Sequence, residues 1–274
     1  FILRWLMNLF TFRIGVALAV ASALLLAAPV CSKSGGVSVR RAASYTAAQN
    51  LILNIVADNT TVNIRSSMAK QINVAALLYN AERIDYVVQP IGLDAIEQLV
   101  VWAKVAKEYR DRASAILDLS VPTDTKIEVT LRRGDINIAG PMKGNGILMT
   151  ENGHVRVEKA KGSYYIETQN GDISVENLEG SLNARSEVGA IKVTGTFTKG
   201  STNRLKTVYG DVEVGIAGQP NISLIGTTDN GLVKTSGTSD LLVKDKSVSG
   251  AFGSGDAAID INVQSGSIVV NKLP

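Results

Sequence analysis

Few side chains of this 274-residue chain could carry out chemistry, and their types limit what that chemistry could be. Asp135, Asp172 and Asp211 each follow a glycine and could act as the paired carboxylates of a polysaccharide-cleaving enzyme. An aspartate beside a turn glycine more often accepts hydrogen bonds from local backbone, and we interpret all three in this way. His154 is the only histidine and Cys31 the only cysteine, so the usual zinc ligand set and an internal disulfide are excluded.

Other ligand-binding motifs are incomplete or explained by the repeat described below. Gly144-Asn-Gly146 lacks the third glycine of a dinucleotide loop, and neither a phosphate-binding loop nor the glycine-rich calcium nonapeptide occurs. We interpret the integrin-type tripeptide Arg133-Gly134-Asp135 as a chance match. Tyr164, Tyr165 and Tyr209 do not occupy equivalent positions of the repeat, so we do not expect them to line up as an aromatic platform for a sugar. We therefore predict no catalytic residue, no cofactor, no metal site and no enzyme activity.

The elements that must position these residues are short strands that repeat from residue 134 to residue 270. One phrase recurs: glycine, any residue, Ile or Val, any residue, and usually Ile or Val. It begins at Gly134, Gly153, Gly171, Gly189, Gly210, Gly231 and Gly266. The first five steps between these glycines are 19, 18, 18, 21 and 21 residues, and the last, of 35, is about two coils long. A fixed period near 20 residues indicates a stacked repeat.

The register of the repeat indicates how the periods stack. The positions two and four residues after each glycine are β-branched, as on the buried side of a strand, so we expect Ile173 and Val193 to point inward. A row of hydroxyl residues stands three places before the glycines: Thr150, Thr168, Ser186, Thr207 and Thr228. The Asn-Gly turns also fit an antiparallel meander, but one residue type at one phase favours parallel coils. We predict an all-β fold, a β-solenoid or β-helix-like stack of 18–21-residue coils, preceded by an N-terminal hydrophobic helix.

The N-terminal residues resemble a targeting segment. Ile14–Val30 is an uncharged run of 17 residues that follows two arginines, so residues 1–31 form a signal peptide or a membrane anchor. Cleavage, retention and lipidation at Cys31 remain alternatives. This predicts an exported protein of the cell envelope, periplasmic or at the cell surface, with a membrane contact through residues 1–31. The 28 basic and 25 acidic residues show no cationic cluster, which argues against nucleic-acid binding.

The rest of the chain divides by composition. We expect a linker at 32–45, an N-terminal β segment at 46–122 and the repeat solenoid at 123–274. Leu93–Arg112 has helical spacing of its apolar residues, yet it also contains a run suited to a strand. We favour a strand there because the flanking segments alternate as strands do.

Three phrases carry a resemblance to a known family: Gly134-Asp-Ile-Asn-Ile, Asn170-Gly-Asp-Ile-Ser-Val and Tyr209-Gly-Asp-Val-Glu-Val. They resemble the bacterial "putative adhesin" family, envelope proteins with a hydrophobic N-terminus followed by repeated Asn-Gly-Asp-Ile coils. The resemblance is close from residue 115 to residue 235 and weakens on both sides. It implies a β-helix-like fold in an exported or membrane-tethered protein, and it transfers no functional residue.

These observations give three expectations for function. The first is a non-catalytic, exported or membrane-tethered envelope protein, an adhesin-like module whose solenoid surface binds an unknown envelope polymer or surface protein. The alternative is an envelope scaffold that self-associates through its end coils, because unpaired strand edges can pair between molecules. A polysaccharide-active β-helix enzyme ranks third.

Overall fold

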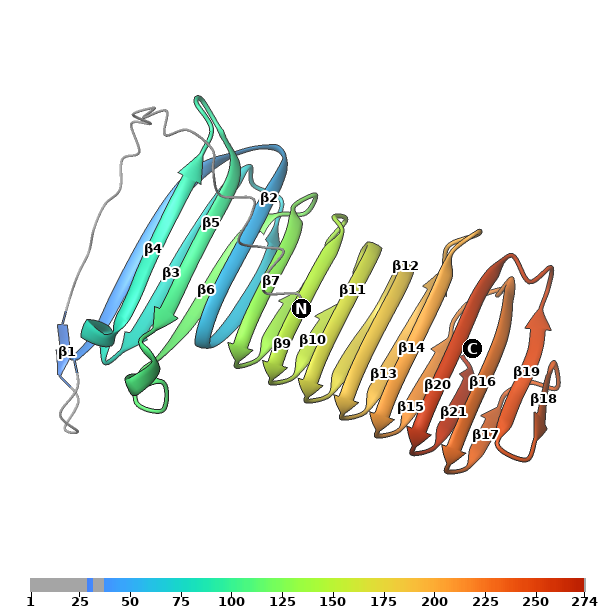
Figure 1. Cartoon of the computed structure of the whole chain (residues 1–274). Helices are drawn as coiled ribbons and strands as arrows, with labels where there is room; N and C mark the ends of the chain where they lie inside the picture. Colours follow the sequence, from blue (N-terminus) through green and yellow to red (C-terminus); the bar gives the residue numbers. More distant parts are fainter. Residues whose placement is uncertain (1–28, 32–36, 274) are drawn as a thin grey trace, which may run out of the picture.

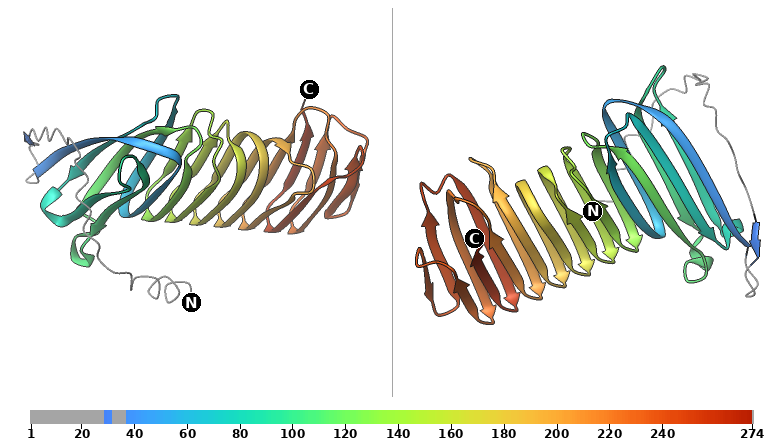
Figure 2. Two further views of the ribbon diagram at one scale, coloured as in Figure 1. Left: turned by 90° about the horizontal axis from the view of Figure 1, so that it is seen from above. Right: turned by 180° about the vertical axis from the view of Figure 1, so that it is seen from behind.

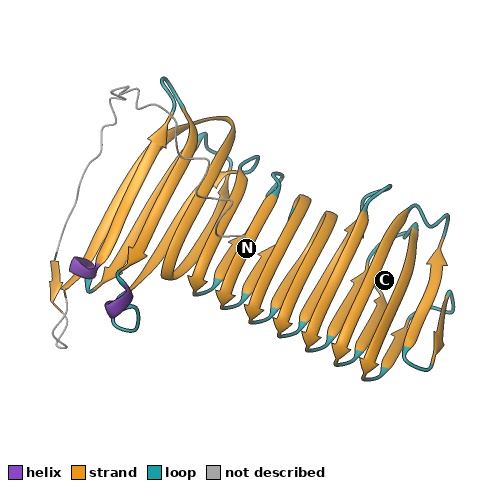
Figure 3. Cartoon of the chain, viewed as in Figure 1, coloured by secondary structure: helices purple, strands orange, loops and turns teal. Residues whose placement is uncertain are grey.

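A computed structural model describes residues 29–31 and 37–273 of the chain. The predicted N-terminal hydrophobic helix lies outside these described residues. Within them the fold is all-β and largely parallel, and the helical segments are two 3-10 turns, η3 (Ala81–Arg83) and η4 (Lys107–Tyr109) (Figure 3). The strands stack along one axis into an elongated body, with the N-terminal strands toward one end and the C-terminal strands toward the other (Figure 2).

Each period of the repeat forms a coil with one strand before its glycine and one after it. The strands before the glycines, here called the leading ladder, include β7 (Lys126–Arg133), β9 (Gly146–Asn152), β11 (Lys161–Asn170), the second half of β12 (Ile173–Val188) and β14 (Thr202–Tyr209). The strands after them, the trailing ladder, include β8 (Ile136–Ala139), β10 (Val155–Glu158), the first half of β12, β13 (Ile191–Phe197) and β15 (Val212–Ile216). Neighbouring strands run parallel, and Val155 lies opposite both Ile136 and Ile173. The parallel stacking predicted from the repeat is therefore confirmed (Figure 1).

Aliphatic side chains fill the space between the two ladders in continuous columns. Ile173 is 1% exposed and Val193 is fully buried, as predicted, and their neighbours in the column are Ile or Val as well. Burial of one such side chain contributes about 1.5–3 kcal/mol. The repeat of β-branched residues therefore supplies the core of the stack, with few aromatic residues.

The corner of each coil requires glycine because the backbones of adjacent coils come too close for a side chain. Gly171 has a φ of 155°, and a Cβ on it would lie 1.9 Å from the carbonyl oxygen of Gly153. The same conflict, at 1.9–2.1 Å, recurs at Gly153, Gly189, Gly210, Gly231 and Gly266. The glycine repeat is therefore a packing requirement of the stack.

The predicted hydroxyl row lies inside the stack beside this glycine corner. Each hydroxyl donates a hydrogen bond to the carbonyl of the glycine in a neighbouring coil. The donors are Thr150, Thr168, Ser186, Thr207 and Thr228, at oxygen–oxygen distances of 2.7–3.2 Å. These bonds satisfy polar atoms that would otherwise be costly to bury. The row thus joins neighbouring coils at the same position of each repeat.

The segment before the repeat continues the same ladders. It contains β1 (Pro29–Cys31), β2 (Val37–Ser67), β3 (Gln71–Tyr79), β4 (Ile84–Ile91), β5 (Ile96–Val105) and β6 (Ser114–Pro122). The middle of β2 pairs in parallel with β5 and β7, and its end pairs in parallel with β6 and β8. The coil at 51–67 is therefore inserted between two coils that follow it in sequence. The strand favoured within Leu93–Arg112 is confirmed as β5.

Antiparallel strands complete this end of the stack. β3 pairs with the start of β2 and with β6, while β4 pairs with β5 and β1 with the start of β2. These strands extend both ladders beyond the first parallel coil and make the N-terminal part of the stack wider than the rest (Figure 1).

The C-terminal end contains a second insertion. Its strands are β16 (Ile222–Asn230), β17 (Val233–Ser236), β18 (Leu241–Lys244), β19 (Ser247–Phe252), β20 (Ala257–Ser265) and β21 (Ile268–Lys272). β20 lies between β14 and β16, and β21 lies between β15 and β17, all in parallel. β19 pairs antiparallel with β16, and β18 pairs antiparallel with β19, as a cap on the leading ladder. The 35-residue step from Gly231 to Gly266 does not hold two successive coils, because the chain leaves the stack to build the cap and then returns to lie between earlier coils.

Candidate functional site

The three aspartates considered as catalytic candidates bond to the backbone of adjacent coils. Asp135 accepts a hydrogen bond from the His154 N–H at 2.8 Å, and Asp172 accepts one from the Ala190 N–H at 2.8 Å. Asp211 accepts one from the Ser267 N–H at 2.6 Å. The predicted backbone role is confirmed, although the donor belongs to the next coil rather than to the same turn. Each aspartate therefore links the corners of two coils.

His154 takes the same role one coil away from Asp135. Its Nδ1 accepts a hydrogen bond from the Asp172 N–H at 3.0 Å, so the lone pair of this nitrogen is already used. The chance interpretation of the tripeptide at 133–135 also agrees with the contacts of its charged residues. Arg133 forms an ion pair with Asp111 at 2.9 Å, while Asp135 holds the backbone of the next coil.

The remaining single-residue candidates do not converge on a site. Tyr164 is buried and Tyr165 is 37% exposed, which confirms the predicted phases. Among residues 37–273, no group of three or more His, Cys, Asp or Glu side chains could hold a metal ion. The described residues also contain no helix of the length and apolarity that a membrane span needs.

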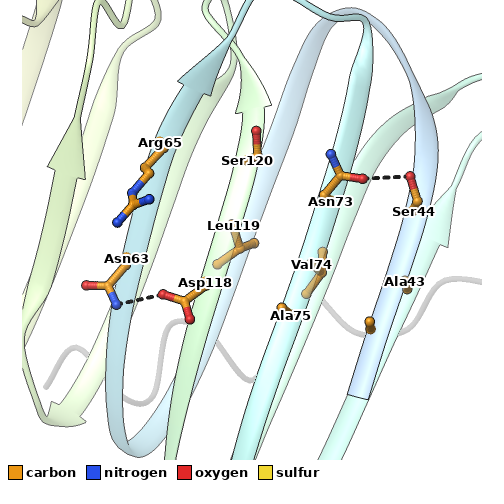
Figure 4. Close-up of a pocket in the computed structure, with 11 residues that line it drawn as sticks. Ala43, Ser44, Asn63, Arg65, Asn73, Val74, Ala75, Asp118, Leu119 and Ser120 are labelled. Carbon is orange, nitrogen blue, oxygen red and sulfur yellow. Dashed lines mark hydrogen bonds between the residues drawn. The ribbon is translucent and has the colours of Figure 1, made fainter. Parts of the chain in front are cut away.

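A groove that the sequence analysis missed lies on the outer side of the trailing ladder, near its N-terminal end. Its volume is about 570 Å³, and it crosses the start of β2, then β3, β6 and the end of β2 (Figure 4). The alanines Ala42 and Ala75 lie opposite each other in register and are both exposed, so short side chains form its floor. The strand registers place polar residues from distant parts of the sequence beside this floor.

One polar row crosses the groove at the height of Ala75. The register aligns Ala75 with Asp118, Asp118 with Asn63, and Asn63 with Asn137. Asn137 Nδ2 donates to Asn63 Oδ1 at 2.9 Å, and Asn63 Nδ2 donates to Asp118 Oδ1 at 2.8 Å. These bonds fix the orientation of the Asp118 carboxylate and leave its second oxygen for another donor (Figure 4).

A second row lies two residues along the strands and contains Ser44, Asn73, Ser120 and Arg65. The Ser44 hydroxyl donates to Asn73 Oδ1 at 2.8 Å, so the Asn73 amide N–H groups remain as donors. Arg65 is exposed and is the only positively charged residue of the groove lining, as Asp118 is the only negatively charged one. The groove thus presents donors and acceptors side by side with balanced charge.

The match to a known family covers much of this architecture. The model of the Toastrack DUF4097 family matches residues 107–271, which is more than half of the chain. This chain belongs to the DUF4097 toastrack family. The matched region contains the glycine repeat and the inserted C-terminal coil. Of the polar residues in the groove, it includes Asp118 and Ser120, whereas Ser44, Asn63, Arg65 and Asn73 precede it.

Solved structures similar to this DUF4097 chain include proteins described as adhesins. A "putative cell adhesion protein" from Clostridium sporogenes has 12% sequence identity and a TM-score of 0.37, covering 86% of this chain and 99% of its own. A "putative adhesin" from Bacteroides fragilis has 10% identity and a TM-score of 0.39, covering 85% and 97%. Similarity at this level carries no argument about function. Among curated proteins, none matches the chain.

Proposed function

We propose that this DUF4097 protein is a non-catalytic, exported or membrane-tethered module of the cell envelope that binds its partner, as an adhesin does, with the outer surface of a β-solenoid. One observation carries the proposal. The aspartates and the histidine of the repeat hold adjacent coils together, at donor–acceptor distances of 2.6–3.0 Å, instead of converging on a reaction centre. The stack is therefore a rigid support for outward side chains.

The predicted leader at 1–31 and the resemblance to envelope proteins support this location, which can be tested independently. We expect cell fractionation to place the protein with the envelope and added protease to digest it once the outer barrier is opened. A cytoplasmic location in intact cells would remove the proposal.

The binding role requires a direct measurement with the full chain. We expect purified protein to cosediment saturably with envelope fragments of the producing cell and to leave the polysaccharide of those fragments intact. Asp172→Asn and Asp211→Asn should bind as the unmodified protein does, because asparagine keeps the acceptor oxygen that each backbone N–H needs. Polysaccharide turnover that either substitution abolishes would instead identify an enzyme.

A second candidate is self-assembly through the end coils, which one observation favours. Within the described residues, β17 pairs with β21 alone, and the cap of β18 and β19 extends the leading ladder but not the trailing one. The free edge of β17 is therefore a place where another strand could add. Sedimentation velocity should then show association that rises with concentration, whereas a monomer at every concentration would reject this candidate.

A further inference from the structure

We propose that the groove crossed by β2, β3 and β6 binds a neutral, hydroxyl-rich glycan chain. The proposal rests on the envelope-binding function above, because it names the ligand class for one part of the solenoid surface. It goes beyond the family match, since most of the polar residues concerned precede residue 107. Three features of the groove support the proposal: preorganised hydrogen-bonding groups, balanced charge, and a shallow floor that crosses the strands.

The first feature is that the polar groups are already held in place. Asn63 fixes one oxygen of Asp118 at 2.8 Å, and the Ser44 hydroxyl fixes the Asn73 amide at 2.8 Å. Each contact uses one side of a planar group and leaves the other side for a ligand. Asp118 therefore offers an acceptor and Asn73 offers donors without a further loss of side-chain freedom, which lowers the cost of binding.

The second feature is the pairing of one cation with one anion. Arg65 and Asp118 are the two charged residues of the lining, and they face the same groove. A polyanion would bring like charge to Asp118, and a polycation would bring like charge to Arg65, so each meets an unfavourable contact. A sugar hydroxyl both donates and accepts, so neighbouring hydroxyls can satisfy the carboxylate and the guanidinium together.

The third feature is the shape of the floor. Ala42 and Ala75 leave a shallow apolar strip on which the C–H face of a sugar ring can rest. The polar rows run across the strands, whose spacing is about 4.8 Å, comparable to the length of one sugar unit. A glycan lying along the rows would therefore meet one strand per sugar, and the hydrogen-bonded row continues past the groove to Asn137.

The test measures binding of hexasaccharides to the purified full chain by calorimetry. The neutral probes are β-1,4-linked hexamers of N-acetylglucosamine and of glucose, and the charged probes are hexamers of glucosamine (cationic) and galacturonate (anionic). We expect at least one neutral hexamer to bind at least about tenfold more tightly than either charged hexamer. Asp118→Asn should weaken the neutral complex about tenfold, through loss of a charge-assisted bond, and should improve the relative binding of the galacturonate hexamer.

A blocking variant and a matched control locate the site. Ala75→Trp fills the floor from an exposed strand position and should abolish binding of the neutral hexamer. Thr130→Trp makes a comparable change at an exposed strand position of the leading ladder and should leave binding within about twofold. Circular dichroism of both variants checks that the fold is retained.

The outcomes separate the two proposals. Neutral binding that Ala75→Trp leaves unchanged would overturn the groove as the site, and tightest binding of a charged hexamer would overturn the ligand class. If envelope fragments bind the protein and none of the hexamers does, the glycan inference fails while the proposed function stands. If neither the fragments nor the hexamers bind, both fail.

Discussion

The hydroxyl of Tyr164 is a buried polar atom whose removal should stabilise the protein. Its ring lies in register between Gly146 and Leu182, and a Cβ on Gly146 would lie 2.4 Å from the ring. Tyr164 is 3% exposed, and its hydroxyl has no hydrogen-bond partner within the described residues. A buried hydroxyl without a partner costs about 1–3 kcal/mol. We therefore expect Tyr164→Phe to raise the free energy of unfolding by about 1–2 kcal/mol at pH 8.

The same substitution should have a larger effect at alkaline pH. Burial raises the pKa of Tyr164 to about 12, from about 10 in the unfolded chain. Between these values the unfolded chain releases the proton and the folded chain keeps it, so rising pH favours unfolding. The contribution of the neutral Tyr164 to the free energy of unfolding is fully present below pH 10 and is lost by about pH 12. For a shift of two pKa units this loss amounts to about 2.7 kcal/mol. Phenylalanine cannot ionise, so the advantage of the variant should grow by about 1.4 kcal/mol at pH 11.

The assay is urea denaturation of both proteins at pH 8 and pH 11, followed by circular dichroism. Tyr209→Phe is the control, because Tyr209 is 57% exposed and its loss should change stability by less than about 0.5 kcal/mol. A Tyr164→Phe variant that is less stable than the unmodified protein at pH 8 would mean that the hydroxyl is bonded. An advantage that stays constant between the two pH values would refute the raised pKa.

Four further substitutions test the stack itself by the same denaturation assay. Ile173→Asn should lower the free energy of unfolding by several kcal/mol, because it places an amide in a buried aliphatic column. Asp172→Asn should lower it by less than about 1 kcal/mol, and similar losses at both positions would contradict the predicted inward and outward faces of the strand. Ala190→Asn should raise the free energy of unfolding by about 0.5–1.5 kcal/mol, because asparagine supplies an acceptor oxygen for the Asp211 N–H that the Ala190 methyl cannot offer. No increase would argue against the hydrogen bonds between coil corners. Gly171→Ala should cost at least about 3 kcal/mol or prevent folding, because its Cβ would meet the preceding glycine's carbonyl at 1.9 Å, and a mild effect would mean looser corners.

The parallel stack could be predicted because the repeat places one residue type at one height in every coil. Ile173 and Val193 lie inward as their phase required, and Thr168 donates to the carbonyl of the glycine in the preceding coil. In such a structure, the alternation of apolar and polar residues along one strand also determines which side chains pack against the neighbouring coils. The sequence period alone therefore determined which face of each strand is buried.

The order of the coils in space could not be predicted for the same reason. The coil at 51–67 and the coil at 257–272 present alternating apolar strands that fit beside any other coil, so the pattern does not say which neighbours they take. The groove was missed because its residues lie far apart in sequence: Asn63 and Asp118 meet through a parallel register between β2 and β6. No linear motif joins such residues, and the groove segment lacks the glycine repeat.

The inserted strands β20 and β21 make completion of this end of the stack depend on segments that are synthesised after the cap. During translation, β16 and β17 leave the ribosome before β20 and β21, which must later lie between them and β14 and β15. If β16 pairs early with β14, it occupies the position beside β14 that β20 takes in the finished stack. This pairing is a kinetic trap, because it must break before β20 can enter. The coils from β14 to β19 should therefore gain protection from proteolysis in a single late step, only after β20 and β21 have entered the stack.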